Sequence, residues 1–93
     1  MIKVIVVDDE RFVRMGIVGE TDWASLGCEV VGEAENGLDA LELVHKKNPD
    51  LMICDIRMPK MNGLEMLKKL REEKNPVQVI FLTAYSEFSY ARE

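Results

Sequence analysis

The stretch Val4-Ile5-Val6-Val7-Asp8-Asp9-Glu10 places four consecutive apolar residues directly before three acidic ones. A short, continuous run of Val and Ile is typical of a strand that is buried on both faces, as in a parallel sheet covered by helices. Working outward from this stretch, the sequence predicts a set of such strands, each bounded by turn residues. They cover Ile2 to Val7, Cys28 to Ala34, Leu51 to Cys54 and Val77 to Leu82.

Segments with helical periodicity separate these strands. In each segment, apolar residues recur at i, i+3 and i+6, and this spacing predicts an amphipathic helix whose apolar stripe faces the sheet. The stripes consist of Phe12, Met15 and Val18; of Leu38, Leu41 and Val44; and of Leu64, Leu67 and Leu70.

Asparagine side chains are expected to cap the second and third helices. Asn36 and Asn62 each precede an acidic residue by three positions. This spacing is typical of a capping box, and the acids, Asp39 and Glu65, also favour the positive end of the helix dipole. Since the residue before a proline is pushed out of the α region, the same helices are expected to end at Asn48-Pro49 and Asn75-Pro76.

Strands that alternate with helices predict an α/β protein with an open, doubly wound parallel sheet and right-handed crossovers. A chain of 93 residues makes a single domain. A further helix is expected to begin near Tyr85, and it meets no Gly or Pro stop before Glu93. We therefore expect the domain to be truncated at its C-terminal end, which would leave the fourth strand either as a bare edge or paired with something absent from this sequence.

The composition excludes several classes of protein. Twelve Lys and Arg residues against 17 Asp and Glu residues give a net charge of −5, which disfavours a general nucleic-acid surface. No apolar stretch is long enough to span a membrane, and Lys3 interrupts any secretory signal, so we expect a cytoplasmic protein without a membrane partner. Cys28 and Cys54 each lie inside an apolar segment, which favours buried free thiols over a disulfide or a metal pair.

Ligands of an open parallel sheet bind outside the carboxyl ends of its strands, so the residues that follow the strands are candidate site residues. Asp8 and Asp9 follow the first strand, Asp55 follows the third, and Thr83 and Ala84 follow the fourth. Converging carboxylates repel one another, and a hard divalent cation such as Mg²⁺ would compensate their charge. The sequence therefore predicts a Mg²⁺ site, whereas the plainer interpretation is an acidic run that only caps the next helix.

Asp55 is also a candidate nucleophile, because a carboxylate can accept a phosphoryl group to form an aspartyl phosphate. A hydroxyl such as that of Thr83 would be able to hold one phosphoryl oxygen. Nucleotide binding is not expected, since no glycine follows the first strand until Gly16. The single histidine, His45, belongs to no recognisable Ser, His and Asp arrangement and is expected to lie on the surface.

Three motifs, in this order, resemble the receiver domain of two-component response regulators. They are Val6-Val7-Asp8-Asp9-Glu10, Asp55-Ile56-Arg57-Met58-Pro59-Lys60-Met61-Asn62-Gly63-Leu64 and Leu82-Thr83-Ala84, and the resemblance covers residues 1–93. It implies a flavodoxin-like fold with the sheet order 2-1-3-4-5. The family's fifth strand and fifth helix would lie beyond Glu93.

The resemblance also implies a ligand set and a reaction. Asp9, Asp55 and the backbone carbonyl of Arg57 would bind Mg²⁺, and Asp8 would act through water. Asp55 would be the phosphoacceptor, taking its phosphoryl group from a phosphohistidine on a sensor histidine kinase. As in the family, the domain would catalyse only its own phosphorylation and dephosphorylation and would not be a conventional turnover enzyme.

Phosphorylation would then bias two conformations of the domain. By resemblance, Thr83 would be the switch residue and Ala84 would leave space beside the phosphoryl group. The segment from Leu82 to Phe88 is similar to receivers joined to AraC-type DNA-binding domains, so the output would be transcription. DNA would then be contacted only by a domain beyond Glu93.

The family pattern continues past Glu93 with a lysine that contacts the phosphoryl group, an aromatic switch residue and the fifth helix. Without these parts we expect impaired phosphoryl transfer and an uncovered sheet face beside the first helix, which would favour self-association.

Two alternative functions are open at this point. One is a protein-interaction module of receiver fold that works without phosphate. The absence of the family's phosphoryl-contacting lysine favours this alternative. The other is a Mg²⁺-dependent phosphohydrolase for small substrates, which would usually carry a second acid two residues after the nucleophile, where this chain has Arg57.

Overall fold

The structure, a computed structural model, describes residues 1–82. The helix expected from Tyr85 onward therefore lies outside the described residues. Over the described range, strands and helices alternate as the hydrophobic runs and helical stripes predicted. The elements are β1 (Ile2–Val7), α1 (Arg11–Glu20), a short 3₁₀ turn (Ala24–Leu26), β2 (Cys28–Ala34), α2 (Gly37–Lys47), β3 (Leu51–Asp55), α3 (Gly63–Glu72) and β4 (Gln78–Leu82).

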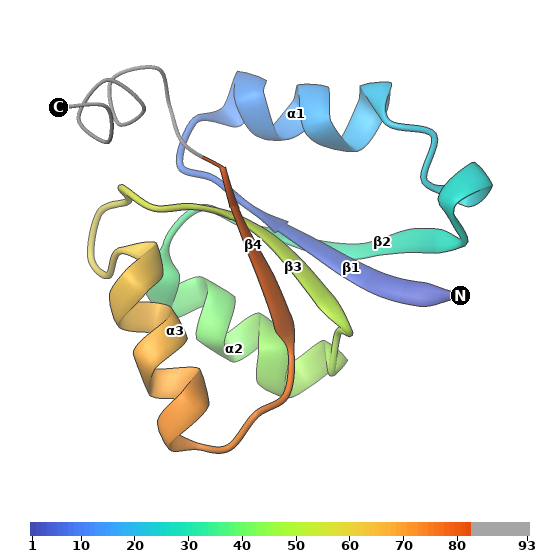
Figure 1. The fold of residues 1–93 in the computed structure, drawn as a ribbon. Helices are drawn as coiled ribbons and strands as arrows, with labels where there is room; N and C mark the ends of the chain where they lie inside the picture. The colour runs from blue at the N-terminus through green and yellow to red at the C-terminus, as the bar shows by residue number, and fades with distance from the viewer. Residues whose placement is uncertain (83–93) are drawn as a thin grey trace, which may run out of the picture.

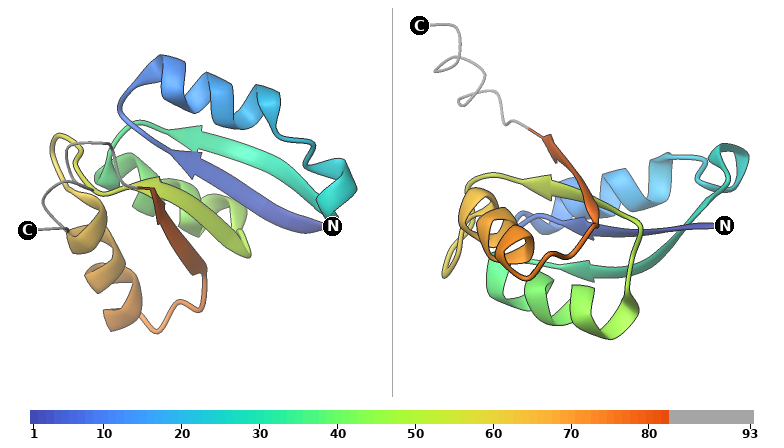
Figure 2. Two further views of the ribbon diagram at one scale, coloured as in Figure 1. Left: turned by 45° about the horizontal axis from the view of Figure 1, so that its top comes forward. Right: turned by 60° about the horizontal axis from the view of Figure 1, so that its bottom comes forward.

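The strands form one parallel sheet of four strands in the order β2-β1-β3-β4. Helix α1 covers one face of this sheet, whereas α2 and α3 cover the other, as Figure 1 and the two views of Figure 2 show. The α/β fold and the order expected from the family are confirmed for the strands that the structure describes. Because all strands run the same way, their carboxyl ends meet along a single edge of the sheet.

Two apolar cores follow from this layering. Val4, Ile5, Val6 and Val7 in β1 are at most 1% exposed, since alternate side chains point to opposite faces and both faces are covered. Ile5 and Val7 pack with α2 and α3, whereas Val4 and Val6 pack with residues of α1 and with Trp23. Free, buried thiols at Cys28 and Cys54 confirm the expectation for the cysteines.

The predicted apolar stripe of α1 is wrong in its details. Phe12 is 86% exposed and Met15 is 51% exposed, whereas Ile17 and Val18 face the core. An α-helix turns about 100° per residue, so residues i and i+6 lie about 120° apart and cannot share one narrow face. Trp23 closes the end of this helix, because its Nε1 donates a hydrogen bond to the carbonyl oxygen of Val18 at 3.2 Å.

The same correction applies to α2 and α3. Leu38 and Leu64, the first residues of the predicted stripes, are 46% and 55% exposed. The faces that are buried follow the i, i+3, i+7 spacing, and three residues so spaced lie within an arc of only about 60° around the helix axis. They consist of Gly37, Ala40 and Val44 in α2 and of Gly63, Met66 and Leu70 in α3.

Both asparagine caps are present as predicted. The Asn36 side chain accepts a hydrogen bond from the Asp39 amide at 2.9 Å, and the Asn62 side chain accepts one from the Glu65 amide at 2.8 Å. At the start of α3 the Glu65 carboxylate also accepts from the Asn62 amide, which completes a capping box. Helix α2 ends at Asn48, which adopts a left-handed conformation directly before Pro49.

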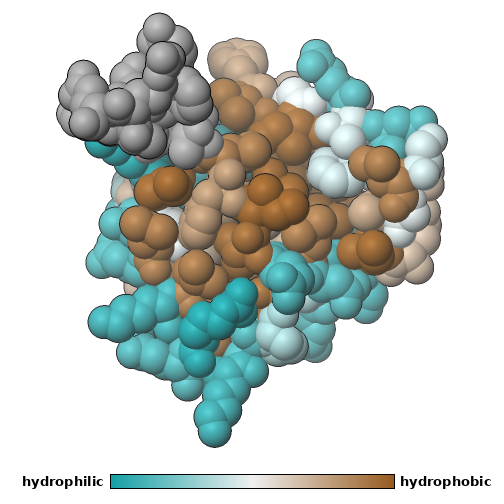
Figure 3. Space-filling view, in the orientation of Figure 1, coloured by the Kyte–Doolittle hydropathy of each residue, from teal (hydrophilic) through white to brown (hydrophobic). Residues whose placement is uncertain are grey.

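Part of the outer surface is apolar. On the α1 side of edge strand β4, Ile80 is 50% exposed, and Figure 3 shows apolar side chains gathered over β4 and the neighbouring strand. Within residues 1–82, no helix is long and apolar enough to cross a membrane. Among residues 1–82 this exposure is in keeping with the expected uncovered face, and self-association stays a prediction.

Candidate functional site

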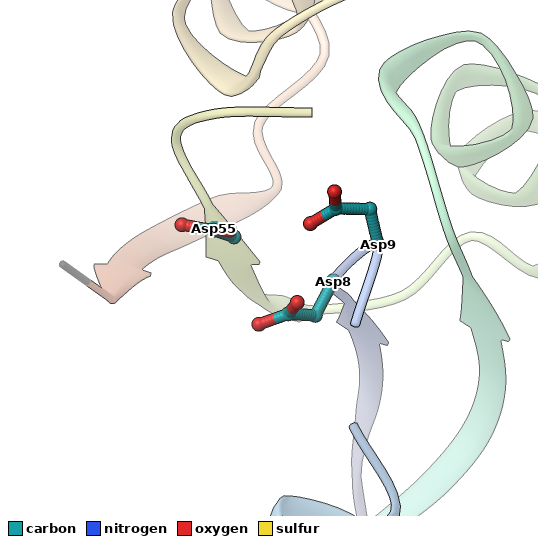
Figure 4. Close-up of side chains that lie close together, drawn as sticks. All are labelled: Asp8, Asp9 and Asp55. Carbon is teal, nitrogen blue, oxygen red and sulfur yellow. The ribbon is translucent and has the colours of Figure 1, made fainter. Parts of the chain in front are cut away.

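Three carboxylates gather where β1 and β3 end. Asp8 and Asp9 follow β1 directly, and Asp55 is the last residue of β3. Val7 lies opposite Cys54 in the β1–β3 register, so the next residue of each chain segment, Asp8 and Asp55, lies beside the other. One carboxylate oxygen from each acid can be chosen so that all three lie within 4.8 Å of one another. Figure 4 shows the three side chains at the ends of β1 and β3.

The turn after β1 is held by its own hydrogen bonds. The Asp8 amide donates to the carbonyl oxygen of Ala34 in β2 at 3.1 Å, and the Glu10 amide donates to Oδ1 of Asp8 at 2.8 Å. The carbonyl of Glu10 then accepts from the Arg14 amide as α1 begins. Asp8 is thereby buried at 4% exposure, while Asp9, between these anchors, is exposed to solvent.

The loop after Asp55 is held by two glycines. The Gly63 amide donates to the carbonyl oxygen of Ile56 at 2.7 Å, and the Gly37 amide donates to that of Met61 at 2.9 Å. A Cβ at Gly63 would lie 2.6 Å from the Asp55 carbonyl oxygen, and one at Gly37 would lie 2.5 Å from that of Met61. Only glycine permits this approach, so the starts of α2 and α3 fix the path of the loop.

Burial raises the pKa of Asp8 above its ordinary value. The amide hydrogen bond from Glu10 opposes this shift, while the charge of Asp9 adds to it. Next to Asp55, burial raises the pKa of the Cys54 thiol to about 12, and the carboxylates of Asp55 and Asp8 contribute to that shift. Negative charge is therefore costly at this end of the sheet.

The donor set fits a hard divalent cation. All three groups are carboxylates, two of them are buried, and their oxygens are close enough to share one ion. Mg²⁺ prefers oxygen ligands and usually takes one or two carboxylates while it keeps several waters. A cation bound between Asp8, Asp9 and Asp55 would offset both the repulsion and the cost of burial. The structure thus brings together the acids that the sequence singled out.

For the other predicted site residues, Arg57, Thr83 and Ala84, the structure tests no role. Arg57 is exposed in the loop after Asp55, and the proposed contact of its carbonyl with Mg²⁺ stays a prediction. Thr83 and Ala84 lie outside the described residues. Their predecessor Leu82 is paired with Asp55 across β3 and β4, so the fourth strand does lead to this edge. His45 lies on the surface as expected, with its Nε2 2.7 Å from a carboxylate oxygen of Glu73.

Sequence reasoning missed Arg14. This residue, in the first turn of α1, donates from Nη1 to the carbonyl oxygen of Asp8 at 2.6 Å and from Nε to the Glu33 carboxylate at 3.1 Å. A cation in the first turn of a helix is unfavourable for the helix dipole. That misfit, just after an acidic run, was the available signal that Arg14 has a partner at the strand ends.

Comparisons with known proteins agree with this geometry. The family model of the response regulator receiver domain matches residues 4–93. The chain is 42% identical over 93 residues to the uncharacterized transcriptional regulatory protein YesN of Bacillus subtilis, covering 100% of this chain and 25% of that protein. It is 41% identical over 93 residues to the transcriptional regulatory protein BtsR of Salmonella typhimurium, covering 96% of this chain and 36% of that protein.

A solved structure shares the fold. The receiver (REC) domain of AraT, a response regulator from Geobacillus stearothermophilus, superposes with a TM-score of 0.88 at 43% identity, covering 99% of this chain and 72% of that one. The chain thus spans a quarter to about a third of the regulators YesN and BtsR, and most of an isolated receiver domain.

Proposed function

The chain belongs to the response regulator receiver domain family, whose members are signalling modules rather than turnover enzymes, and we propose that Asp55 is its phosphoacceptor. The observation that carries this proposal is the convergence of the Asp55 carboxylate with those of Asp8 and Asp9, within 4.8 Å, at the carboxyl ends of β1 and β3. The donor is a phosphohistidine on a sensor histidine kinase.

Asp55 is positioned as a nucleophile. Its Oδ1 accepts a hydrogen bond from the Ile56 amide at 2.8 Å, which fixes the plane of the carboxylate at the end of β3. A carboxylate oxygen attacks phosphorus, the phosphorus–nitrogen bond to the donor imidazole breaks, and the imidazole keeps the electron pair and takes up a proton. The signal ends by hydrolysis of the aspartyl phosphate: water attacks phosphorus, the bond between phosphorus and the Asp55 oxygen breaks, and inorganic phosphate leaves.

Asp8, Asp9 and Asp55 would hold Mg²⁺, together with the backbone carbonyl of Arg57. Bound there, the ion supplies positive charge that offsets the negative charge of the phosphoryl oxygens and of the acids. By resemblance to the family, Asp8 would act through water, and the Glu10 amide, which donates to its Oδ1 at 2.8 Å, holds the carboxylate in place.

The switch begins at the end of β4. We assign Thr83 to the hydroxyl that holds a phosphoryl oxygen, and Ala84 to the small residue that leaves space for it. What supports this assignment is the pairing of Leu82 with Asp55, which brings the end of β4 beside the acceptor. Phosphorylation then biases the segment after β4 between two conformations.

The output of the whole protein is transcription. The relatives YesN and BtsR are transcriptional regulatory proteins, and this chain matches a quarter to about a third of their length. DNA contact belongs to the part of such proteins outside the receiver, in keeping with the net charge of −5 of this chain.

Intact-protein mass spectrometry after incubation with Mg²⁺ and a small phosphodonor tests the acceptor. The wild-type chain gains one phosphoryl group, whereas Asp55→Asn gains none and EDTA abolishes the gain. Asp50→Asn is the matched control, because Asp50 lies before β3 at the opposite end of the same strand. If the folded wild-type chain gains no phosphoryl group, the phosphate-independent interaction module is the better account.

A further inference from the structure

Arg14 joins three elements at the edge of the acidic site. It belongs to α1, its Nη1 contacts the carbonyl oxygen of Asp8 after β1 at 2.6 Å, and its Nε contacts the Glu33 carboxylate of β2 at 3.1 Å. Its side chain is only 16% exposed, against 43% for Glu33. The guanidinium is therefore a largely buried clamp rather than a solvated surface charge, and its planar fork suits two acceptors at once.

The clamp acts on the turn that carries both aspartates. The Asp8 peptide is held on its amide side by Ala34 at 3.1 Å and on its carbonyl side by Arg14. The carbonyl of Asp8 is bonded to the amide nitrogen of Asp9, so fixing this carbonyl fixes the peptide plane from which Asp9 projects. Asp9 itself is exposed and has less packing around it than Asp8.

We propose that Arg14 is a positioning residue for the Mg²⁺ site, holding the Asp8–Asp9 peptide so that both carboxylates face Asp55. This inference rests on the proposed function, because it assumes that the acids act together on a cation. Arg14 contacts the backbone of the site and not the ion or the phosphoryl group. Groups that orient metal ligands in this way commonly change metal affinity by about tenfold or more when they are removed.

The direction in which Mg²⁺ affinity changes when Arg14 is removed distinguishes a positioning role from a purely electrostatic one. Arg14 carries a positive charge beside a cation site, so by electrostatics alone its removal would tighten Mg²⁺ binding. If positioning dominates, removal loosens the Asp8–Asp9 turn and weakens Mg²⁺ binding. The two accounts therefore predict opposite changes in the same dissociation constant.

Isothermal titration calorimetry with Mg²⁺ alone, at low ionic strength, measures this constant. Arg14→Met keeps the unbranched apolar stem but removes the donors, and we expect its dissociation constant for Mg²⁺ to rise about tenfold. Arg14→Lys keeps the charge and one donor group, and should recover part of the affinity.

Arg71→Met is the matched control. Arg71 is also an arginine clamp, since Nη1 donates to the Asn75 carbonyl at 2.7 Å and Nη2 to that of Val77 at 2.8 Å. Its acceptors precede β4, at the end of the sheet away from the aspartates. Arg71→Met should lower the unfolding midpoint as Arg14→Met does, but leave the Mg²⁺ constant unchanged.

Wild-type or tighter Mg²⁺ binding in folded Arg14→Met overturns the inference, as does an equal loss in Arg71→Met. The phosphodonor experiment on the wild-type chain keeps the two proposals apart. If the wild type is phosphorylated and Arg14→Met binds Mg²⁺ normally, the positioning role fails and the proposed function stands. If Arg14→Met loses Mg²⁺ affinity but the wild type accepts no phosphoryl group, the positioning role stands and the proposed function fails.

Discussion

A methyl group placed on Gly63 would lie 2.6 Å from the carbonyl oxygen of Asp55, so the first residue of α3 is packed directly against the backbone of the acceptor. The side chain of Phe81 in β4 closes the same space, with its Cε1 2.8 Å from the ideal Cβ position. The start of α3, the end of β3 and β4 therefore cannot move independently at this point.

Gly63→Ala should destabilise the protein and slow phosphorylation of Asp55. The added methyl group has backbone on one side and a ring on the other, and such overpacking costs about 1–3 kcal/mol. Urea unfolding gives the loss of stability, and the rate of mass gain with a small phosphodonor gives the loss of function. A Gly63→Ala variant with wild-type stability and rate would contradict the close packing described for this glycine.

Gly16→Ala is the control for that substitution. Gly16 lies inside α1, and an ideal Cβ there has no atom within 4 Å. Alanine restricts the unfolded chain without a clash, so the free energy of unfolding should rise by about 0.5–1 kcal/mol. The same chemical change thus moves stability in opposite directions at the two positions, which urea midpoints measured side by side can show.

Asp8→Asn should stabilise the protein when Mg²⁺ is absent. Burial raises the pKa of Asp8, and the charge of Asp9 adds to the shift, so the ionised carboxylate is a cost to the folded state. Asparagine keeps an oxygen for the Glu10 amide and removes that charge, with an expected gain on the order of 1 kcal/mol. In EDTA the variant should unfold at a higher temperature than the wild type.

With Mg²⁺ the order should reverse. Binding of Mg²⁺ to the folded state raises wild-type stability in proportion to the logarithm of its concentration, and a site with one carboxylate fewer gains less. Thermal melts over a Mg²⁺ series follow both variants. An unchanged Mg²⁺ dependence in Asp8→Asn would show that Asp8 does not contribute to the ion site.

Stability should fall in alkaline solution because of Cys54. Burial raises the pKa of its thiol from the ordinary 9.0 to about 12. Between these values the unfolded chain releases the thiol proton and the folded chain keeps it, so stability is full below pH 9 and is lost progressively toward pH 12. Urea midpoints of the wild type should therefore fall more steeply with rising pH than those of Cys54→Ala.

Cys54→Ala makes that comparison specific, because it removes only this thiol. Parallel pH profiles of the two proteins would contradict the burial of this thiol.

Much of the fold could be predicted from the sequence because its strands are short apolar runs bounded by turn residues, and Val4 to Val7 in β1 are buried on both faces. β1 and β2 begin and end at the predicted residues, Ile2–Val7 and Cys28–Ala34. The starts of α2 and α3 could also be predicted, because the Asn36 and Asn62 side chains accept hydrogen bonds from amides of the first helical turn, which have no partner within the helix. The convergence of Asp8, Asp9 and Asp55 followed from parallel strands, whose carboxyl ends share one edge.

The helix faces could not be predicted as well. Leu38 and Leu64 lie on the outside although they look like core residues, and the buried face of α2 includes the small residues Gly37 and Ala40, which a search for large apolar residues overlooks. Arg14 was missed for a different reason. A cation in the first turn of α1 hints at a partner, but the sequence does not say that this partner is the backbone carbonyl of Asp8 together with the Glu33 carboxylate.

The central claim, that Asp55 is the phosphoacceptor of a Mg²⁺-assisted site, is tested most directly by locating the phosphoryl group. The chain is incubated with Mg²⁺ and a small phosphodonor, and borohydride then reduces any aspartyl phosphate to homoserine before peptide mapping by mass spectrometry. We predict homoserine at position 55, dependent on Mg²⁺, with Asp8 and Asp9 unmodified. Modification at another residue, or none at Asp55 in a folded chain, would contradict the account.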